Sequence, residues 1–134
     1  MTAQIPEELS HEGQQWPLFT EPLAAYFKQT GLRPGFVSPH TALWRGYVGS
    51  WLIEDGYLYL TALQGHLRDG SEATLHTLFP DAGDRVKADW FTGTLRVPQG
   101  SQLEYVHMGF GSVFERELRI DVEAGKVLGQ SFAE

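Results

Sequence analysis

Residues 41–63 read TALWRGYVGSWLIEDGYLYLTAL, and this stretch decides the fold. Its apolar residues recur at every second position on both sides of Asp55-Gly56, the period at which successive side chains of a strand share a face. Asp-Gly between two apolar runs is a strong hairpin signal, because both residues accept the positive φ angles of a tight turn. The sequence therefore predicts a strand over residues 41–53, a turn at Asp55-Gly56 and a returning strand over residues 57–63.

Predicted strands continue after this hairpin to the end of the chain. We place them at residues 86–97, with a break at Gly93, and at residues 102–110, 113–122 and 126–132. A Pro-Gln-Gly turn is expected between the first two of these. Strands that return about every 8 to 12 residues are typical of an antiparallel meander. The expected fold is therefore mainly β, a meander that forms a small barrel, a half-barrel or a sandwich.

Two short helices are expected beside the strands. Thr20 is a plausible N-cap and Gly31 a stop signal for a helix over residues 20–30, and a second helix is expected over residues 71–79. We expect one domain over residues 1–134, made of a loosely packed N-terminal arm (1–17), a helix and connector (18–40) and a β body (41–132).

The composition limits the chemistry that the chain can perform. It has 134 residues and no cysteine, which excludes a disulfide scaffold, a cysteine-ligated zinc site and a thiol nucleophile. A domain of this size can bury a core without such staples. The absence of cysteine is compatible with a reducing cytosol, and no apolar stretch has the length of a signal peptide or a membrane span. We therefore expect a cytoplasmic protein.

The charge favours some partners over others. The net charge is −7, from 17 acidic and 10 basic residues. Binding to nucleic acid or to an anionic membrane needs clustered Lys and Arg, so neither is expected. The same charge suits a basic protein partner, although it also serves solubility alone.

No catalytic or cofactor motif stands out. The histidines do not show the helical spacing of a zinc protease, and the chain has no Gly-x-Ser-x-Gly nucleophile elbow. Gly109 and Gly111 precede a strand pattern, which is not the setting of a dinucleotide-binding loop. Glu115 and Glu117 share one strand face, where solvated carboxylates are commoner than a glycosidase pair. We therefore expect no metal and no cofactor, and we lean towards a protein without catalytic activity.

The candidate site consists of polar residues on apolar strand faces. Arg45, His107 and Arg116 each alternate in register with apolar neighbours. Tyr47 shares the predicted face of Arg45, and Tyr105 that of His107. A guanidinium among apolar side chains must be paired or solvated, because burying its charge is costly. These five residues are the candidate ligand-binding residues, lining a pocket for an anionic ligand.

The same pattern has a structural interpretation. A carboxylate such as Asp89 or Glu115 could hold one of the arginines as a brace inside the core. A β-bulge would also change which face a residue occupies, and Gly46, Gly49 and Gly109 are candidate bulge positions. The sequence leaves both interpretations open.

Five short segments resemble a group of small bacterial β-rich proteins. They are TALWRGYV at 41–48, WLI at 51–53, LYL at 58–60, ADWFTG at 88–93 and YVHMG at 105–109. The resemblance covers residues 17–128. The function of that family is uncharacterised, so the resemblance implies a bacterial source and no particular chemistry.

Two hypotheses of function follow. The first is a non-catalytic protein-binding module, such as an immunity protein or antitoxin that occupies a basic toxin, since the chain is small, acidic and rich in aromatic residues. The second is a small-molecule-binding protein or hydrolytic enzyme with an anion-binding pocket in the β body. A self-associating structural subunit is a third possibility, because exposed strand edges can pair. The sequence does not give the oligomeric state.

Overall fold

The computed structural model describes residues 5–39, 42–104 and 113–133; of residues 100–104, 113–116 and 133 it describes the backbone alone. The described elements, in chain order, are β1 (Glu7–His11), β2 (Gln14–Leu18), α1 (Pro22–Thr30), β3 (Tyr47–Glu54), β4 (Tyr57–His66), β5 (Glu72–Ala73), α2 (Leu75–Leu78), β6 (Val86–Lys87), β7 (Gly93–Glu104), β8 (Val113–Glu123) and β9 (Lys126–Ala133). The prediction of a mainly β fold with short helices is confirmed.

The nine strands of the described residues form one mixed sheet. Its order is β2-β1-β3-β4-β9-β8-β7, and the short strands β5 and β6 pair with β4. All recorded pairs are antiparallel except β1 with β3, so the sheet is not the purely antiparallel meander expected. The chain makes the parallel pair possible because it crosses from β2 to β3 through α1 and a long connector.

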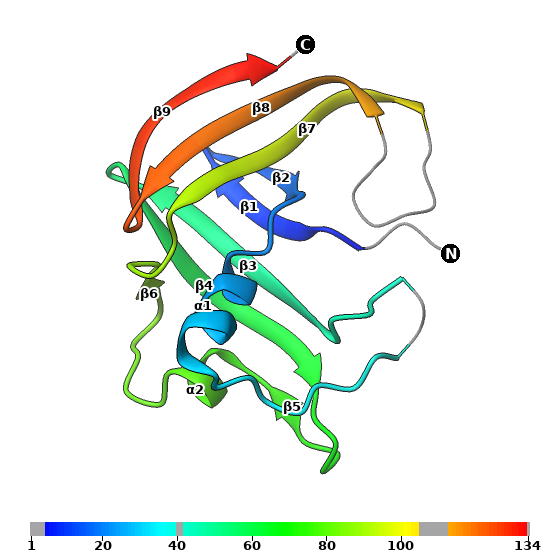
Figure 1. Ribbon diagram of the computed structural model, residues 1–134, viewed down its shortest axis with the longest axis vertical. Coiled ribbons are helices and arrows are strands. Elements are labelled where there is room, and N and C mark those ends of the chain that lie inside the picture. Colours follow the sequence, from blue (N-terminus) through cyan, green and yellow to red (C-terminus); the bar gives the residue numbers. More distant parts are fainter. Residues whose placement is uncertain (1–4, 40–41, 105–112, 134) are drawn as a thin grey trace.

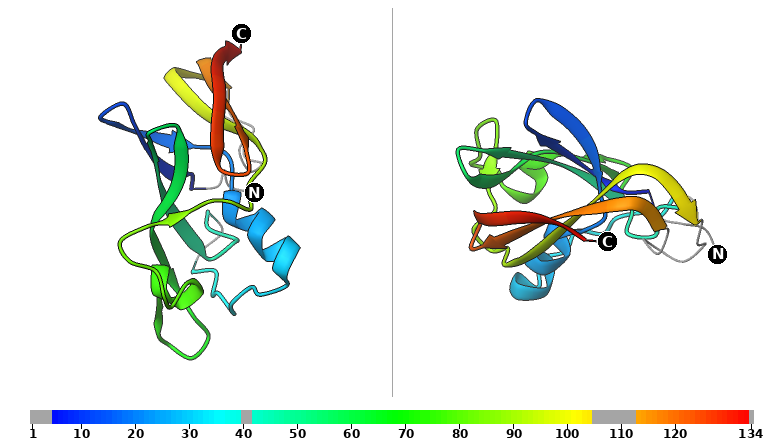
Figure 2. Two further views of the ribbon diagram at one scale, coloured as in Figure 1. Left: turned by 90° about the vertical axis from the view of Figure 1, so that its left-hand side faces the viewer. Right: turned by 90° about the horizontal axis from the view of Figure 1, so that it is seen from above.

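The sheet is strongly curled and does not close into a barrel. Figure 1 shows β7, β8 and β9 as an upper layer, with β1 and β2 beneath it and β3 and β4 descending from the same region. Figure 2 shows the separation between the β7–β9 layer and the β3–β4 ribbon from two other sides. Between the layers lies the core, which includes the fully buried Leu9, Leu18, Leu60, Leu95 and Ile120.

The hairpin that decides the fold forms as predicted. Asp55 and Gly56 have φ angles of 53° and 81°, the two positive values of a tight hairpin turn. The first strand begins later than expected, at Tyr47, because the preceding residues form a turn that ends at Gly46. Gly46 has a φ of 79°, and a Cβ there would lie 2.8 Å from the Phe36 Cβ. Only glycine fits this approach of turn and connector.

The N-terminal region differs from the expected loose arm. Residues 7–18 form the β1–β2 hairpin, whose turn at Glu12-Gly13 has φ angles of 53° and 77°. Leu9 and Leu18 are fully buried, and Leu9 pairs with Trp51 of β3. This segment therefore contributes a pair of strands and core residues to the sheet.

The strands β8 and β9 follow the prediction, whereas the stretch before them differs from it. Residues 88–92 form no strand, and residues 105–110 of the strand expected over 102–110 lie outside the described residues. β8 and β9 are joined at Ala124-Gly125, whose φ angles are 48° and 82°. β7 begins at the predicted break, Gly93, but continues through the expected Pro-Gln-Gly turn. Its register with β8 shifts after Gln99, so an irregularity in the strand takes the place of a turn.

Candidate functional site

The structure describes two of the five predicted site residues fully. Arg45 lies two residues before Tyr47, the first residue of β3. Arg116 lies in β8, where its backbone pairs with Gln99, but its side chain is outside the description. Tyr105 and His107 lie outside the described residues. Convergence of the five side chains on one pocket therefore stays a prediction.

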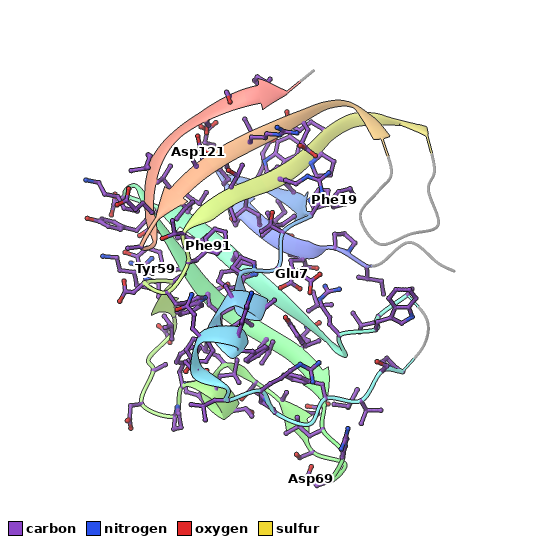
Figure 3. All side chains as sticks on the ribbon, in the orientation of Figure 1. Glu7, Phe19, Tyr59, Asp69, Phe91 and Asp121 are labelled. Carbon is purple, nitrogen blue, oxygen red and sulfur yellow. The ribbon has the colours of Figure 1, made fainter. Side chains whose placement is uncertain are left out.

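Arg45 forms a buried ion pair with Glu7. The Arg45 Nη2 donates to Glu7 Oε2 at 2.8 Å, and the side chains are 8% and 0% exposed. Glu7 Oε2 also accepts from the Gly49 backbone N–H at 2.8 Å, and its Oε1 accepts from the Trp51 Nε1 at 3.3 Å. Figure 3 shows Glu7 at the junction of β1 and β3. The carboxylate is thus held by three donors from the β3 side of the sheet.

Local backbone geometry explains why this carboxylate can be buried. The parallel pairing aligns Glu8 with Ser50, so Glu7 comes beside Gly49. A Cβ on Gly49 would lie 2.7 Å from Glu7 Oε1. Glycine at this position therefore leaves the space that the carboxylate occupies. Gly49 was a candidate position for a β-bulge. The register shift lies instead between Ser50 and Trp51, and Gly49 makes room for the Glu7 carboxylate.

Burial dominates the electrostatics of this cluster. Desolvation raises the pKa of Glu7 to about 7, against the opposing effects of Arg45 and of the Gly49 and Trp51 hydrogen bonds. Burial also raises the pKa of Tyr47, with the charges of Glu7 and Glu21 acting in the same direction. Tyr47 packs its ring 5.5 Å from the Arg45 guanidinium carbon. The phenol therefore stays protonated, and the Glu7 carboxyl titrates near neutral pH.

This geometry supports the structural interpretation of Arg45. Its charge faces Glu7 inside the protein, and a second carboxylate, Glu21, places its Oε1 3.8 Å from the Arg45 Nε. The sequence suggested Asp89 or Glu115 as a carboxylate that holds one of the polar residues; the described carboxylate beside Arg45 is Glu7, and the Glu115 side chain lies outside the description. Asp89 is exposed. Sequence reasoning missed Glu7 because the residues before the first helix were expected to be loosely packed.

A second polar cluster lies on the outer face of β7 and β8. Arg96 and Arg119 are directly paired across the strands. Glu117 bridges them: its Oε1 lies 2.9 Å from Arg96 Nη2, and its Oε2 lies 2.8 Å from Arg119 Nε. Burial acts to raise the pKa of Glu117, but the hydrogen bonds and charges of the two arginines outweigh it and hold that pKa below its usual value. The bridge offsets the repulsion between opposed like charges.

Beside this cluster, a shallow hollow of about 510 Å³ crosses the outer face of the β7–β9 layer. It is lined by Thr94, Arg96, Arg119, Asp121 and Ser131. Thr94 donates its hydroxyl to Asp121 Oδ1 at 2.9 Å. Because these residues belong to β7, β8 and β9, the hollow extends across all three strands.

β9 has an open edge in the described part of the molecule. β4 pairs with β9 at Tyr57 and Lys126 alone, so from Leu128 to Ser131 no described strand pairs with that edge. The His11 side chain of β1 does reach this stretch, where its Nε2 lies 3.1 Å from Gln130 Oε1. In Figure 1, β9 is the outermost strand of the upper layer. Leu128 and Phe132 are 60% and 53% exposed. Exposed apolar side chains on a strand edge that has no paired neighbour are typical of a surface that pairs with another chain.

The structure shows neither a metal-binding cluster nor a membrane-spanning helix among the residues that it describes. Within them, no group of three His, Asp or Glu side chains is placed to hold a metal ion. None of their helices is both long and apolar enough to cross a lipid bilayer. The chain matches no family model, no curated protein and no solved structure.

Proposed function

We propose that this protein is a non-catalytic binding module that docks a basic protein partner at the open edge of β9. The observation that carries the proposal is this edge: from Leu128 to Ser131, no strand among the described residues pairs with it. A partner that adds a strand there gains main-chain hydrogen bonds along the sheet. Leu128 and Phe132 supply apolar contacts beside those bonds.

The charge of the chain supports a basic partner. A net charge of −7 attracts a basic protein over long range and raises the rate of encounter at low salt. No charged residue occurs in the segment 127–133, so a partner strand at this edge meets no charged side chain from that segment. The target of an immunity protein or antitoxin would be a partner of this kind.

The geometry favours this module over an anion-binding pocket around Arg45. Such a pocket needs a cation that faces solvent or ligand. The side chain of Arg45 is 8% exposed, and the carboxylate of Glu7 meets its charge at 2.8 Å. Arg45 therefore serves as a brace that links Glu7 of β1 to the turn before β3.

The test uses one edge variant and one matched control. Leu128→Lys places a charge on the open edge, whereas Leu32→Lys makes the same change at a Leu that is 65% exposed in the connector after α1. Tagged wild type and both variants are used to capture partners from a lysate of the source organism, and the captured protein is then purified and titrated against each form.

The expected result is a stoichiometric basic protein that binds wild type and Leu32→Lys but not Leu128→Lys. Its association rate should fall as salt is added, because the attraction is screened. Equal binding to all three forms, or no stoichiometric partner at all, would contradict the proposal.

A further inference from the structure

We infer that the partner's strand carries a single Lys or Arg that reaches across Gly129 to the carboxylate of Asp121. This inference rests on the proposed function, and it names the chemistry by which the β9 edge would select its partner. The relevant side chains lie on the outer face of the β7–β9 layer, where Figure 3 labels Asp121 on β8.

The first step is the opening at Gly129. Asp121 of β8 pairs directly with Gly129 of β9. A Cβ built on Gly129 would meet nothing within 4 Å, so the space above this residue is open. Side chains that face one another across paired strands share a face of the sheet. Gly129 itself therefore places no side chain between Asp121 and the open edge.

A side chain of the partner strand must span β9 to reach Asp121 on β8. Neighbouring strands lie about 4.8 Å apart, so a strand added to β9 would run roughly 10 Å from β8. The long side chains of Lys and Arg cover this span with their methylene stems against the sheet and their charge at the end. The glycine gap gives their stems a path. An Asp or Ser side chain at the same position of the partner would be too short to reach Asp121.

The charges of Asp121 and Arg119 decide which side chains of the partner are favoured. Asp121 is exposed and accepts one hydrogen bond, from Thr94. The next outward-facing position of β9 is Ser131, which pairs with Arg119 of β8. A basic residue of the partner beside Ser131 would meet that guanidinium and be repelled. The outer face therefore favours a basic side chain opposite Gly129 and a neutral or acidic one opposite Ser131.

Two variants test this directly. Asp121→Asn removes the charge, and Gly129→Val fills the gap with a residue that favours strands. Because Gly129 has no contact within 4 Å at the Cβ position, the valine should leave the fold intact. Asp84→Asn is the matched control for charge, since Asp84 is exposed in the loop before β6. Thermal unfolding checks that every variant is folded.

The probe is a phage-displayed library of random peptides selected on the wild-type protein. Selected peptides should carry one Lys or Arg within an alternating apolar segment. They should bind Asp121→Asn and Gly129→Val about tenfold more weakly than wild type, as expected for loss of a charge pair within an interface. Binding to Asp84→Asn should be unchanged. The same four forms are then titrated with any partner captured through the edge.

Failure of this inference is separable from failure of the proposed function. If Leu128→Lys abolishes binding while Asp121→Asn and Gly129→Val bind as wild type does, the edge is the site and the proposed basic contact is wrong. If Leu128→Lys also binds normally, the edge itself is refuted. A dimer seen by light scattering and lost in Leu128→Lys would show that a second copy occupies the edge, and it would overturn the inference of a basic partner strand.

Discussion

The stability of the protein should fall as the pH rises from about 4.5 to about 7, because of the buried carboxyl of Glu7. Its pKa is raised from 4.5 to about 7 in the folded state. Between these values the folded protein holds a proton that the unfolded chain has released, so the slope of the unfolding free energy with pH is negative. A shift of this size corresponds to about 3 kcal/mol, most of it between pH 5 and 8.

Urea denaturation of wild type and Glu7→Gln at pH 5, 6, 7 and 8 measures this effect. Glutamine keeps the shape of the side chain and cannot ionise, so the difference between the two proteins cancels the titration of other groups. The wild type should lose about 2 to 3 kcal/mol relative to the variant across this range. The carboxyl carbon of Glu7, followed by NMR, should titrate near pH 7.

A flat difference between wild type and variant would refute the reasoning, and so would a carboxyl that titrates below pH 5. Either result would mean that Arg45, Gly49 and Trp51 stabilise the carboxylate by more than burial costs it. The sign of the slope therefore decides whether desolvation or pairing dominates at this site.

Three further predictions concern the Glu7–Arg45 pair and the Glu117 bridge. Arg45→Met removes the charge that lowers the pKa of Glu7, so the NMR titration of its carboxyl should move further above 7; an unchanged midpoint would contradict the observed pairing. Gly49→Ala places a Cβ 2.7 Å from Glu7 Oε1 and 2.9 Å from Trp51 Nε1, so urea denaturation should show a loss of about 1 to 3 kcal/mol. Glu117→Gln weakens the bridge between the two opposed arginines of β7 and β8, and because their side chains are half exposed the loss should stay below about 1 kcal/mol and shrink in high salt.

The sequence was most informative where local chemistry is decisive. Asp55-Gly56 and Ala124-Gly125 both form tight turns with positive φ angles, and the strands beside them lie near the expected ranges, except that β3 begins six residues later than expected. Alternation also placed Tyr47 and Trp51 correctly on the inner face, where both are 1% exposed. Turn residues and period-two patterning act over a few residues, so they can be recognised without knowledge of the rest of the fold.

Alternation failed where the backbone is irregular. In β4, a strict period of two from Leu58 and Leu60 would bury Ala62. The register shifts opposite Ser50 and Trp51, which makes Thr61 an extra residue, and Leu63 is buried at 4% exposure. A bulge of this kind depends on both strands, and the sequence of either strand alone does not show it.

The partner of Arg45 could not be found by local reasoning, because it lies 38 residues earlier in the chain. The polar composition of the first residues suggested an arm, and Glu7 within it looked like an ordinary surface acid. The parallel pairing of β1 with β3 brings the two charges together, and that pairing is a property of the whole topology. The pattern correctly indicated that Arg45 needs compensation for its charge, although it did not identify the carboxylate.

The ion pair also explains how so short a parallel contact keeps its register. β1 and β3 share three paired positions, Glu8 with Ser50, Leu9 with Trp51 and Ser10 with Leu52. A slip of one residue would turn Leu9 outwards and bring Glu8 to the buried face. It would also move Glu7 away from the gap at Gly49 and leave Arg45 without its carboxylate. Because an unpaired buried charge costs more than the few apolar contacts of this strand pair can offset, the Glu7–Arg45 pair excludes the slipped arrangement.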